Sequence, residues 1–292
     1  MSAPIALRGM LESAIEQVIA NWDLVAKSQA PAAIHQLRVG IRRLRTVLRL
    51  RRTEATRQSI VAFDQRIARV GRHVGQIRDL DVLIGIILHA HRGKEIDNGL
   101  NRLTVILKSR RAAHAKDLAK FFAHSLQTSL RADLARPEGI ANKLDDATKS
   151  PLLKDRAQHD LHRTMKRLKS RAAQFETASI DELHNIRKAA KTVRYTFEFY
   201  AELYPQQQRQ DFLIALKKLQ DVLGTLNDLT LVNHIKAIAN ANQSDANLNH
   251  AAGYLIGYIE AEGTHIRDAA LRSWRKVKRT KLAKYKFDPH QA

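Results

Sequence analysis

Apolar residues recur along this chain at steps of three and four positions, which is the spacing of a helix with one buried face. Ile34, Leu37, Ile41, Leu44 and Leu48 form the clearest stripe of this kind. The pattern predicts an all-α protein. The expected helices span about 5–28, 33–53, 57–75, 80–91, 97–133, 152–176, 181–203, 206–223, 228–241 and 246–275.

Two Gly-x-x-x-Asp segments separate neighbouring apolar stripes and predict helix ends. Gly75 and Gly224 directly follow a stripe, as glycine does at a helix C-terminus that needs a positive φ. Asp79 and Asp228 stand just before the next stripe, which is the position of an N-cap residue. We therefore expect one helix to end and another to begin within each segment.

The chain matches itself when it is shifted by 149 residues, and the register stays unbroken from Ile34 to Leu80. The residues that then coincide include His35 with His184, Arg38 with Arg187, Gly75 with Gly224, and Asp79 with Asp228. Such a register predicts an internal duplication. We expect a single domain, 1–292, made of two repeats of about 1–137 and about 151–292, which pack as two pseudo-symmetric helical bundles.

Charge narrows the range of partners. The 292 residues include 50 Lys and Arg but only 29 Asp and Glu, so the formal net charge is +21. A charge this large indicates a polyanionic partner or an anionic surface. The chain has no cysteine, which excludes a disulfide scaffold, a Cys-ligated metal site and thiol catalysis.

No apolar stretch approaches the length of a membrane span. The longest, Ala251–Ile259, runs to nine residues, whereas a membrane helix needs roughly 20. The N-terminus lacks the basic cluster and apolar run of a signal peptide. We therefore expect a soluble, cytoplasmic protein without a membrane partner.

A row of basic residues runs beside the first apolar stripe, one position further along the chain. From His35 to Arg52 the chain holds seven arginines and no carboxylate, whereas a solvated helix face usually mixes both signs. Consecutive side chains of the row lie about 5 Å apart along the helix axis, so the row suits a linear chain of phosphate groups. The row consists of His35, Arg38, Arg42, Arg45, Arg49 and Arg52.

The second half carries a shorter basic row, which ends at Glu198. Its members are His184, Arg187, Lys188, Lys191 and Arg194. Arg69 and Lys218, on the helices that follow the two rows, are further candidates for anion contact. The alternative is a solvated face, and some arginines are expected to pair with Asp79, Asp81 or Asp228.

His35 and His184 are better suited to contact phosphate than to bind a metal. Cations surround both, and no carboxylate lies three or four residues from His35, so we expect no metal site and no cofactor. A phosphoryl-accepting histidine of the phosphotransfer type is an alternative, but the surrounding arginines suit a held anion better. Hydrolysis needs a metal or paired carboxylates, which the rows lack, so we expect no catalytic residues.

The two rows and the Asp-Leu pairs at 79–80 and 228–229 resemble the signatures of the CHAD family, the conserved histidine α-helical domains. The resemblance reaches from the first helix to about Trp274. It implies an all-helical domain with a basic central groove or pore. It also implies non-catalytic binding of inorganic polyphosphate and association with polyphosphate granules. The family's basic positions fall on His35, Arg38, Arg42, Arg45, His184, Arg187, Lys191 and Arg194.

Nucleic acid is the second candidate ligand, because phosphate contacts alone distinguish polyanions poorly. Aromatic residues make up only 5% of the chain, and the rows include none apart from Tyr195 and Phe197. A platform on which single-stranded bases stack is therefore disfavoured, whereas contact with a duplex backbone stays open. The expected order of ligands is polyphosphate first and the nucleic-acid backbone second.

Overall fold

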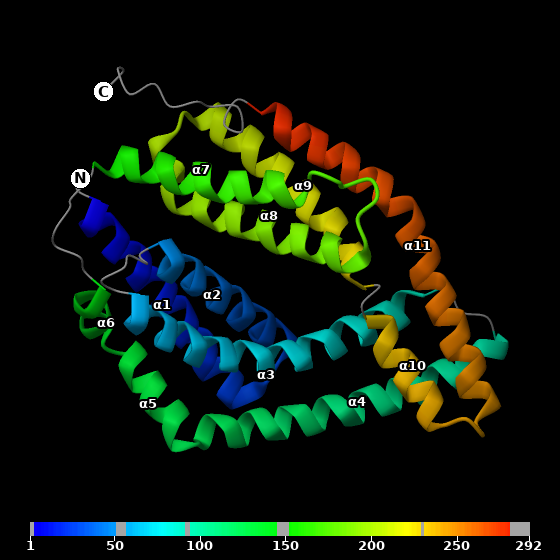
Figure 1. Ribbon diagram of the computed structural model, residues 1–292. Coiled ribbons are helices and arrows are strands. Elements are labelled where there is room, and N and C mark those ends of the chain that lie inside the picture. Colours follow the sequence, from blue (N-terminus) through cyan, green and yellow to red (C-terminus); the bar gives the residue numbers. More distant parts are fainter. Residues whose placement is uncertain (1–2, 51–56, 91–93, 145–151, 229–230, 281–292) are drawn as a thin grey trace. The chain divides into compact units, whose positions relative to one another are not determined.

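A computed structural model describes residues 3–50, 57–90, 94–144, 152–228 and 231–280, and the elements in these ranges are helices (Figure 1). The all-α fold that the apolar periodicity predicts is confirmed. The helices are α1 (Ala3–Ser28), α2 (Pro31–Leu50), α3 (Arg57–His89), α4 (Lys94–Ala123), α5 (Ser125–Leu134), α6 (Pro137–Leu144), α7 (Leu153–Arg171), α8 (Ile180–Tyr200), a 3-10 turn η1 (Ala201–Leu203), α9 (Gln206–Asp228), α10 (Val232–Ala241) and α11 (Ala246–Arg279).

The helix boundary predicted at the first Gly-x-x-x-Asp segment is wrong, and the one predicted at the second is shifted by a few residues. Gly75 and Asp79 both lie inside α3, so the expected helices 57–75 and 80–91 are one continuous helix. Gly224 lies inside α9, Asp228 is the last residue of that helix, and the N-cap of α10 is Leu231. No described glycine has a positive φ. Glycine in a helix interior costs only about 1 kcal/mol relative to alanine, which a favourable tertiary contact can outweigh.

Other boundaries differ by smaller amounts. The expected helix 97–133 is divided into α4 and α5, and α6 lies in a stretch where no helix was expected. α6 begins at Pro137, a residue that suits the first helical position because its ring sets φ and the missing N–H has no partner there.

The chain divides into two compact units. Unit 1 contains Met1–Leu88 and Thr104–Leu153, and unit 2 contains His89–Leu103 and Lys154–Ala292. α4 therefore contributes its first part to unit 2 and the remainder to unit 1. The internal duplication and the repeats 1–137 and 151–292 stay predictions.

Unit 1 is built on the packing of α1 against α2 (Figure 1). The five apolar residues of the stripe on α2 are buried, with at most 3% of each exposed. Burial of one such side chain stabilises a fold by about 1.5–3 kcal/mol. The two helices approach closely at Gly40, where a Cβ would lie 3.3 Å from Val18 Cγ2 of α1.

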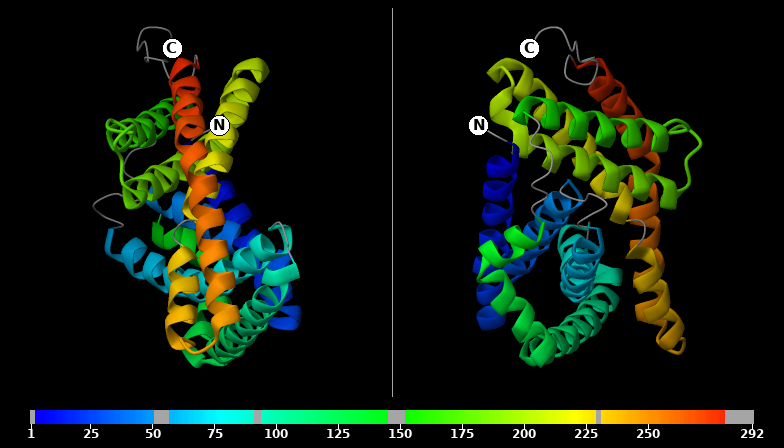
Figure 2. Two further views of the ribbon diagram at one scale, coloured as in Figure 1. Left: turned by 90° about the vertical axis from the view of Figure 1, so that its right-hand side faces the viewer. Right: turned by 60° about the vertical axis from the view of Figure 1, so that its left-hand side comes forward.

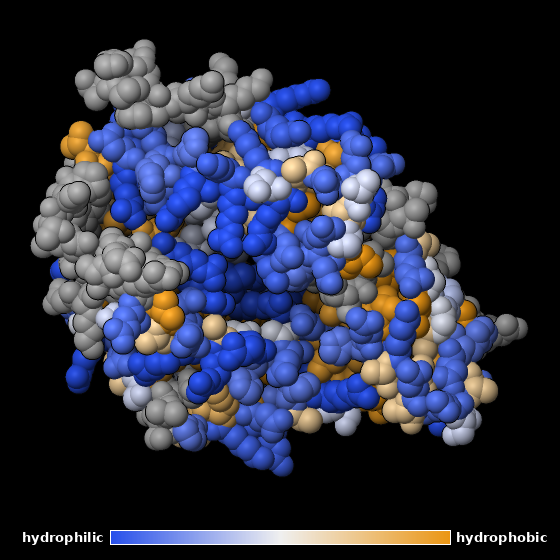
Figure 3. All heavy atoms as spheres, in the orientation of Figure 1, coloured by the Kyte–Doolittle hydropathy of each residue, from blue (hydrophilic) through white to orange (hydrophobic). Residues whose placement is uncertain are grey.

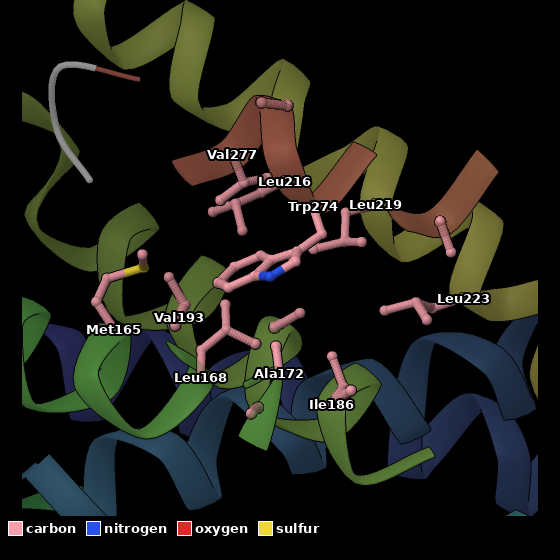
Figure 4. Close-up of a cluster of buried hydrophobic side chains, with 14 of the residues drawn as sticks. Met165, Leu168, Ala172, Ile186, Val193, Leu216, Leu219, Leu223, Trp274 and Val277 are labelled. Carbon is pink, nitrogen blue, oxygen red and sulfur yellow. The ribbon is translucent and has the colours of Figure 1, made fainter. Parts of the chain in front are cut away.

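Unit 2 has a hydrophobic core where α7, α8, α9 and α11 meet. Trp274 of α11 is buried at the centre of this cluster, as Figure 4 shows, beside Leu168 of α7 and Leu219 of α9. α11 packs against both α10 and α9, and these neighbours can be followed in the views of Figures 1 and 2. Its N-terminal part also meets the start of α4, because Gly99 lies directly against Asn247.

Candidate functional site

The first candidate site is the basic row on α2, here called the α2 row. His35, Arg38, Arg42 and Arg45 are half-buried, and Arg49 is exposed. A shift of one residue turns a side chain by about 100° around the helix axis, which moves these residues from the buried stripe to the edge of the core. Arg52 lies outside the described residues. α2 holds five arginines and no carboxylate within Pro31–Leu50.

The side chain of Arg38 lies on α3 and forms two hydrogen bonds with that helix. Its Nη1 donates to Asp79 Oδ1 at 2.9 Å and to the backbone oxygen of Gly75 at 3.1 Å. A Cβ on Gly75 would lie 3.6 Å from the same Nη1, so the absent side chain leaves the guanidinium lying against the helix backbone. The expected pairing of an arginine with Asp79 is present, and position 75 of α3 holds a residue small enough for the guanidinium to lie on the helix.

Arg45 is held by a carboxylate that sequence analysis missed. Its Nε and Nη2 donate to the two oxygens of Asp64 at 2.6 Å and 3.0 Å, a bidentate pair between α2 and α3. Arg42 Nε donates within the helix to the backbone oxygen of Arg38 at 3.3 Å. Asp81, the other carboxylate expected near the rows, pairs instead with Arg111 of α4. Asp79 and Asp64 therefore orient two arginines of the α2 row.

The second basic row, here called the α8 row, has the same relation to its core. His184, Arg187, Lys191 and Arg194 are half-buried, and Lys188 is exposed.

Two side chains of the α8 row, those of Arg187 and Arg194, lie against α9. Arg194 Nε donates to Glu198 Oε1 at 2.6 Å, and its Nη1 donates to Gln220 Oε1 at 3.3 Å. A Cβ on Gly224 would lie 3.9 Å from Arg187 Nη2, so this arginine also passes over a glycine of the following helix. The side chain of Asp228 lies outside the described ones.

The two accessory candidates, Arg69 of α3 and Lys218 of α9, are exposed side chains. The neighbouring His73 stacks on Phe121, with ring centroids 4.1 Å apart. Burial, aided by the positive charge of Arg72, lowers the pKa of His73 below its usual value of 6.5. The neutral ring at pH 7 therefore adds no charge beside Arg69.

Hydrophilic residues cover most of the face drawn in Figure 3, with hydrophobic ones in separate groups. In the part of the chain that the structure describes, no cluster of three or more His, Asp or Glu side chains could hold a metal ion. None of the described helices combines the length and apolarity required to cross a membrane.

The family model of the CHAD domain matches residues 9–236, which is most of the chain. The chain belongs to the CHAD family. The fold agrees with the crystal structure of the CHAD domain from the plant Ricinus communis, at 25% identity and a TM-score of 0.79 over 94% of this chain and 92% of that one. PptA from Streptomyces chartreusis shares the fold at 16% identity and a TM-score of 0.62, over 94% of this chain and 100% of that chain. No curated protein matches the sequence.

Three partners of the rows in this CHAD domain escaped sequence analysis. Asp64, Glu198 and Gln220 each bind a row arginine. Glu198 lies four residues after Arg194, a spacing that places two side chains on one helix face and could have revealed the pair. Asp64 and Gln220 lie on the helix after the row, and no local spacing connects them with it.

Proposed function

We propose that this CHAD domain binds inorganic polyphosphate through the α2 row and the α8 row, and that it does so without catalysing a reaction. The observation that carries the proposal is the set of half-buried arginines at the edge of each core, oriented by carboxylates of the same unit. Fixing these side chains before the ligand arrives reduces the entropy lost on binding.

The ion pairs of Arg38 and Arg45 use only some of the N–H donors of each guanidinium group, and the other donors can bind phosphate. A guanidinium has five N–H donors, and Arg38 uses only Nη1 for Asp79 and Gly75. Arg45 uses Nε and Nη2 for Asp64. The remaining donors suit the oxygens of a phosphate chain, because a guanidinium can form two parallel hydrogen bonds to a phosphate.

The geometry of a row favours a linear ligand over a single phosphate ion. Successive side chains follow the helix axis at about 5 Å intervals, so one chain can contact several of them at once. Each contact after the first is intramolecular, which raises the affinity of a chain far above that of one phosphate. Binding of this kind would bring the protein to polyphosphate granules.

Catalysis is not part of the proposal. Two carboxylates beside the α2 row, Asp64 and Asp79, serve as ion-pair partners of arginines. In these positions they stabilise cations that hold phosphate groups, whereas hydrolysis of a phosphoanhydride requires an activated water and stabilisation of the leaving group.

The decisive experiment is a competition titration of long-chain polyphosphate against duplex DNA at about 0.15 M salt, where exposed charges are screened beyond about 8 Å. The triple variant Arg38→Ala/Arg42→Ala/Arg45→Ala removes three row cations. Its matched control is Lys108→Ala/Lys116→Ala/Lys120→Ala, which removes three exposed cations from α4.

We expect the wild-type protein to prefer polyphosphate, and the row variant to lose at least tenfold in affinity while the control changes little. Hydrogen bonds to charged groups contribute about 1.5–3 kcal/mol each, and 1.4 kcal/mol corresponds to a factor of ten. Equal loss in both variants, or tighter binding of DNA, would mean that the rows are a general phosphate surface. The nucleic-acid backbone would then become the leading ligand.

A further inference from the structure

α7 carries a third concentration of positive charge, which belongs to neither row. From Arg156 to Arg171 this helix holds six Lys and Arg residues, two histidines and one carboxylate. One side of the helix is buried in the core of unit 2. The exposed residues of the other side, here called the α7 face, are His159, His162, Arg163, Lys166, Arg167, Lys169 and Arg171.

The carboxylate of this stretch, Asp160, is turned inward and fully buried. It accepts hydrogen bonds from Arg156 Nε at 2.9 Å, from Arg163 Nη2 at 3.2 Å and from the hydroxyl of Tyr200 on α8 at 2.9 Å. The side chain of Arg163 nevertheless stays 47% exposed. Asp160 therefore anchors arginines at the surface of α7 and leaves the α7 face without an exposed carboxylate of its own helix.

The α7 face and the α8 row lie on different sides of α8. α7 meets α8 at Tyr200, whereas Arg187 and Arg194 of the row lie over Gly224 and Gln220 of α9. At about 100° per residue, Tyr200 is rotated by about 120–140° around the α8 axis from both arginines. A ligand bound along the α8 row would therefore leave the α7 face open.

The charge of α7 is also absent from the helix at the equivalent place in the predicted repeat. A shift of 149 residues pairs α7 with α1, which carries Arg8 and Lys27 but also Glu12, Glu16 and Asp23. The α7 face is thus a property of the second half alone, unlike the rows, which occur in both halves.

We infer that the α7 face binds a further phosphate chain, separate from any chain held by the α2 row and the α8 row, so that one molecule holds more than one polyphosphate chain and cross-links them. This inference rests on the proposed function. The face follows the helix for about 18 Å, and a flexible single chain can follow it. A duplex is stiff, whereas a single phosphate chain can adapt to the spacing of these cations. The apolar side of α7 is committed to the core and cannot insert into a lipid surface.

The test compares the stoichiometry of binding and the cross-linking of chains. Calorimetric titration with a short polyphosphate, about as long as the face (about 18 Å), counts chains per protein. Turbidity with long-chain polyphosphate reports cross-linking. The variant Lys166→Glu/Arg167→Glu reverses two exposed charges of the face, and Lys116→Glu/Lys120→Glu on α4 is the control with the same change in net charge. Circular dichroism establishes that both variants are folded.

We expect the α7 variant to bind one short chain fewer than the wild-type protein and to give less turbidity with long chains, and the control to behave as the wild type. An equal number of short chains bound by the wild-type protein and by the α7 variant would overturn the inference and leave the proposed function intact. If the wild-type protein binds no polyphosphate, the proposed function itself fails. Loss of binding to duplex DNA or to phosphatidylserine vesicles, with polyphosphate stoichiometry unchanged, would also overturn the inference.

Discussion

Replacing Gly75 with alanine is expected to stabilise the protein. Gly75 lies inside α3 without a positive φ, and alanine is favoured over glycine in a helix interior by about 1 kcal/mol. The new Cβ would lie 3.6 Å from Arg38 Nη1, an ordinary van der Waals distance, so no clash offsets this gain. The free energy of unfolding should therefore rise by about 0.5–1 kcal/mol.

The assay is urea denaturation followed by circular dichroism, with Gly224→Ala as the parallel variant in unit 2. Its Cβ would lie 3.9 Å from Arg187 Nη2, so a similar gain is expected. Gly75→Leu should instead displace the guanidinium of Arg38 and weaken polyphosphate binding, while α3 stays helical.

A fall in the free energy of unfolding on replacing Gly75 with alanine would refute this reasoning. If Gly75 ended a helix with a positive φ, a Cβ there would be strained, and alanine would lower the free energy of unfolding by about 1 kcal/mol or more. That outcome would restore the helix end expected from sequence. It would also remove the explanation of Gly75 as the surface on which Arg38 lies.

Three further predictions concern packing, capping and alkaline stability. Gly99→Ala should destabilise unit 2 by more than 1 kcal/mol in the same urea assay, because the new Cβ would collide with the backbone of Asn247. Ser179→Ala should raise the pKa of Glu182, measured by NMR titration, because hydrogen bonds from Ser179 lower it. Burial and the nearby carboxylate of α7 raise the pKa of Tyr200, so wild-type stability should fall as pH rises above about 10. Tyr200→Phe should reduce this slope; an unchanged slope would contradict the assignment.

Much of the fold follows from local pattern. The apolar stripe from Ile34 to Leu48 predicts a helix with one buried side, and the structure buries all five of its members. The shift of one residue between stripe and row predicts that the basic side chains lie at the edge of the core, and most of them are half-buried. Periodicity is sufficient here because a helix converts sequence spacing directly into spatial direction.

Helix ends and the partners of the rows depended on tertiary structure. Arg38 and Asp79 are 41 positions apart and Arg45 and Asp64 are 19 apart, so no periodicity within one helix connects them. The penalty for Gly75 inside a helix is about 1 kcal/mol, too small to decide on its own where α3 ends.

The inward orientation of Asp160 is likewise invisible in a sequence that shows two acids among the cations of α7. The sequence by itself determined the helical fold, the excess of positive charge and the faces on which the rows lie. Only the packing of helices decided which carboxylates hold Arg38 and Arg45, because these two contacts join side chains of different helices. It also decided which cations remain exposed, since burial depends on the neighbours that each helix acquires in the folded unit.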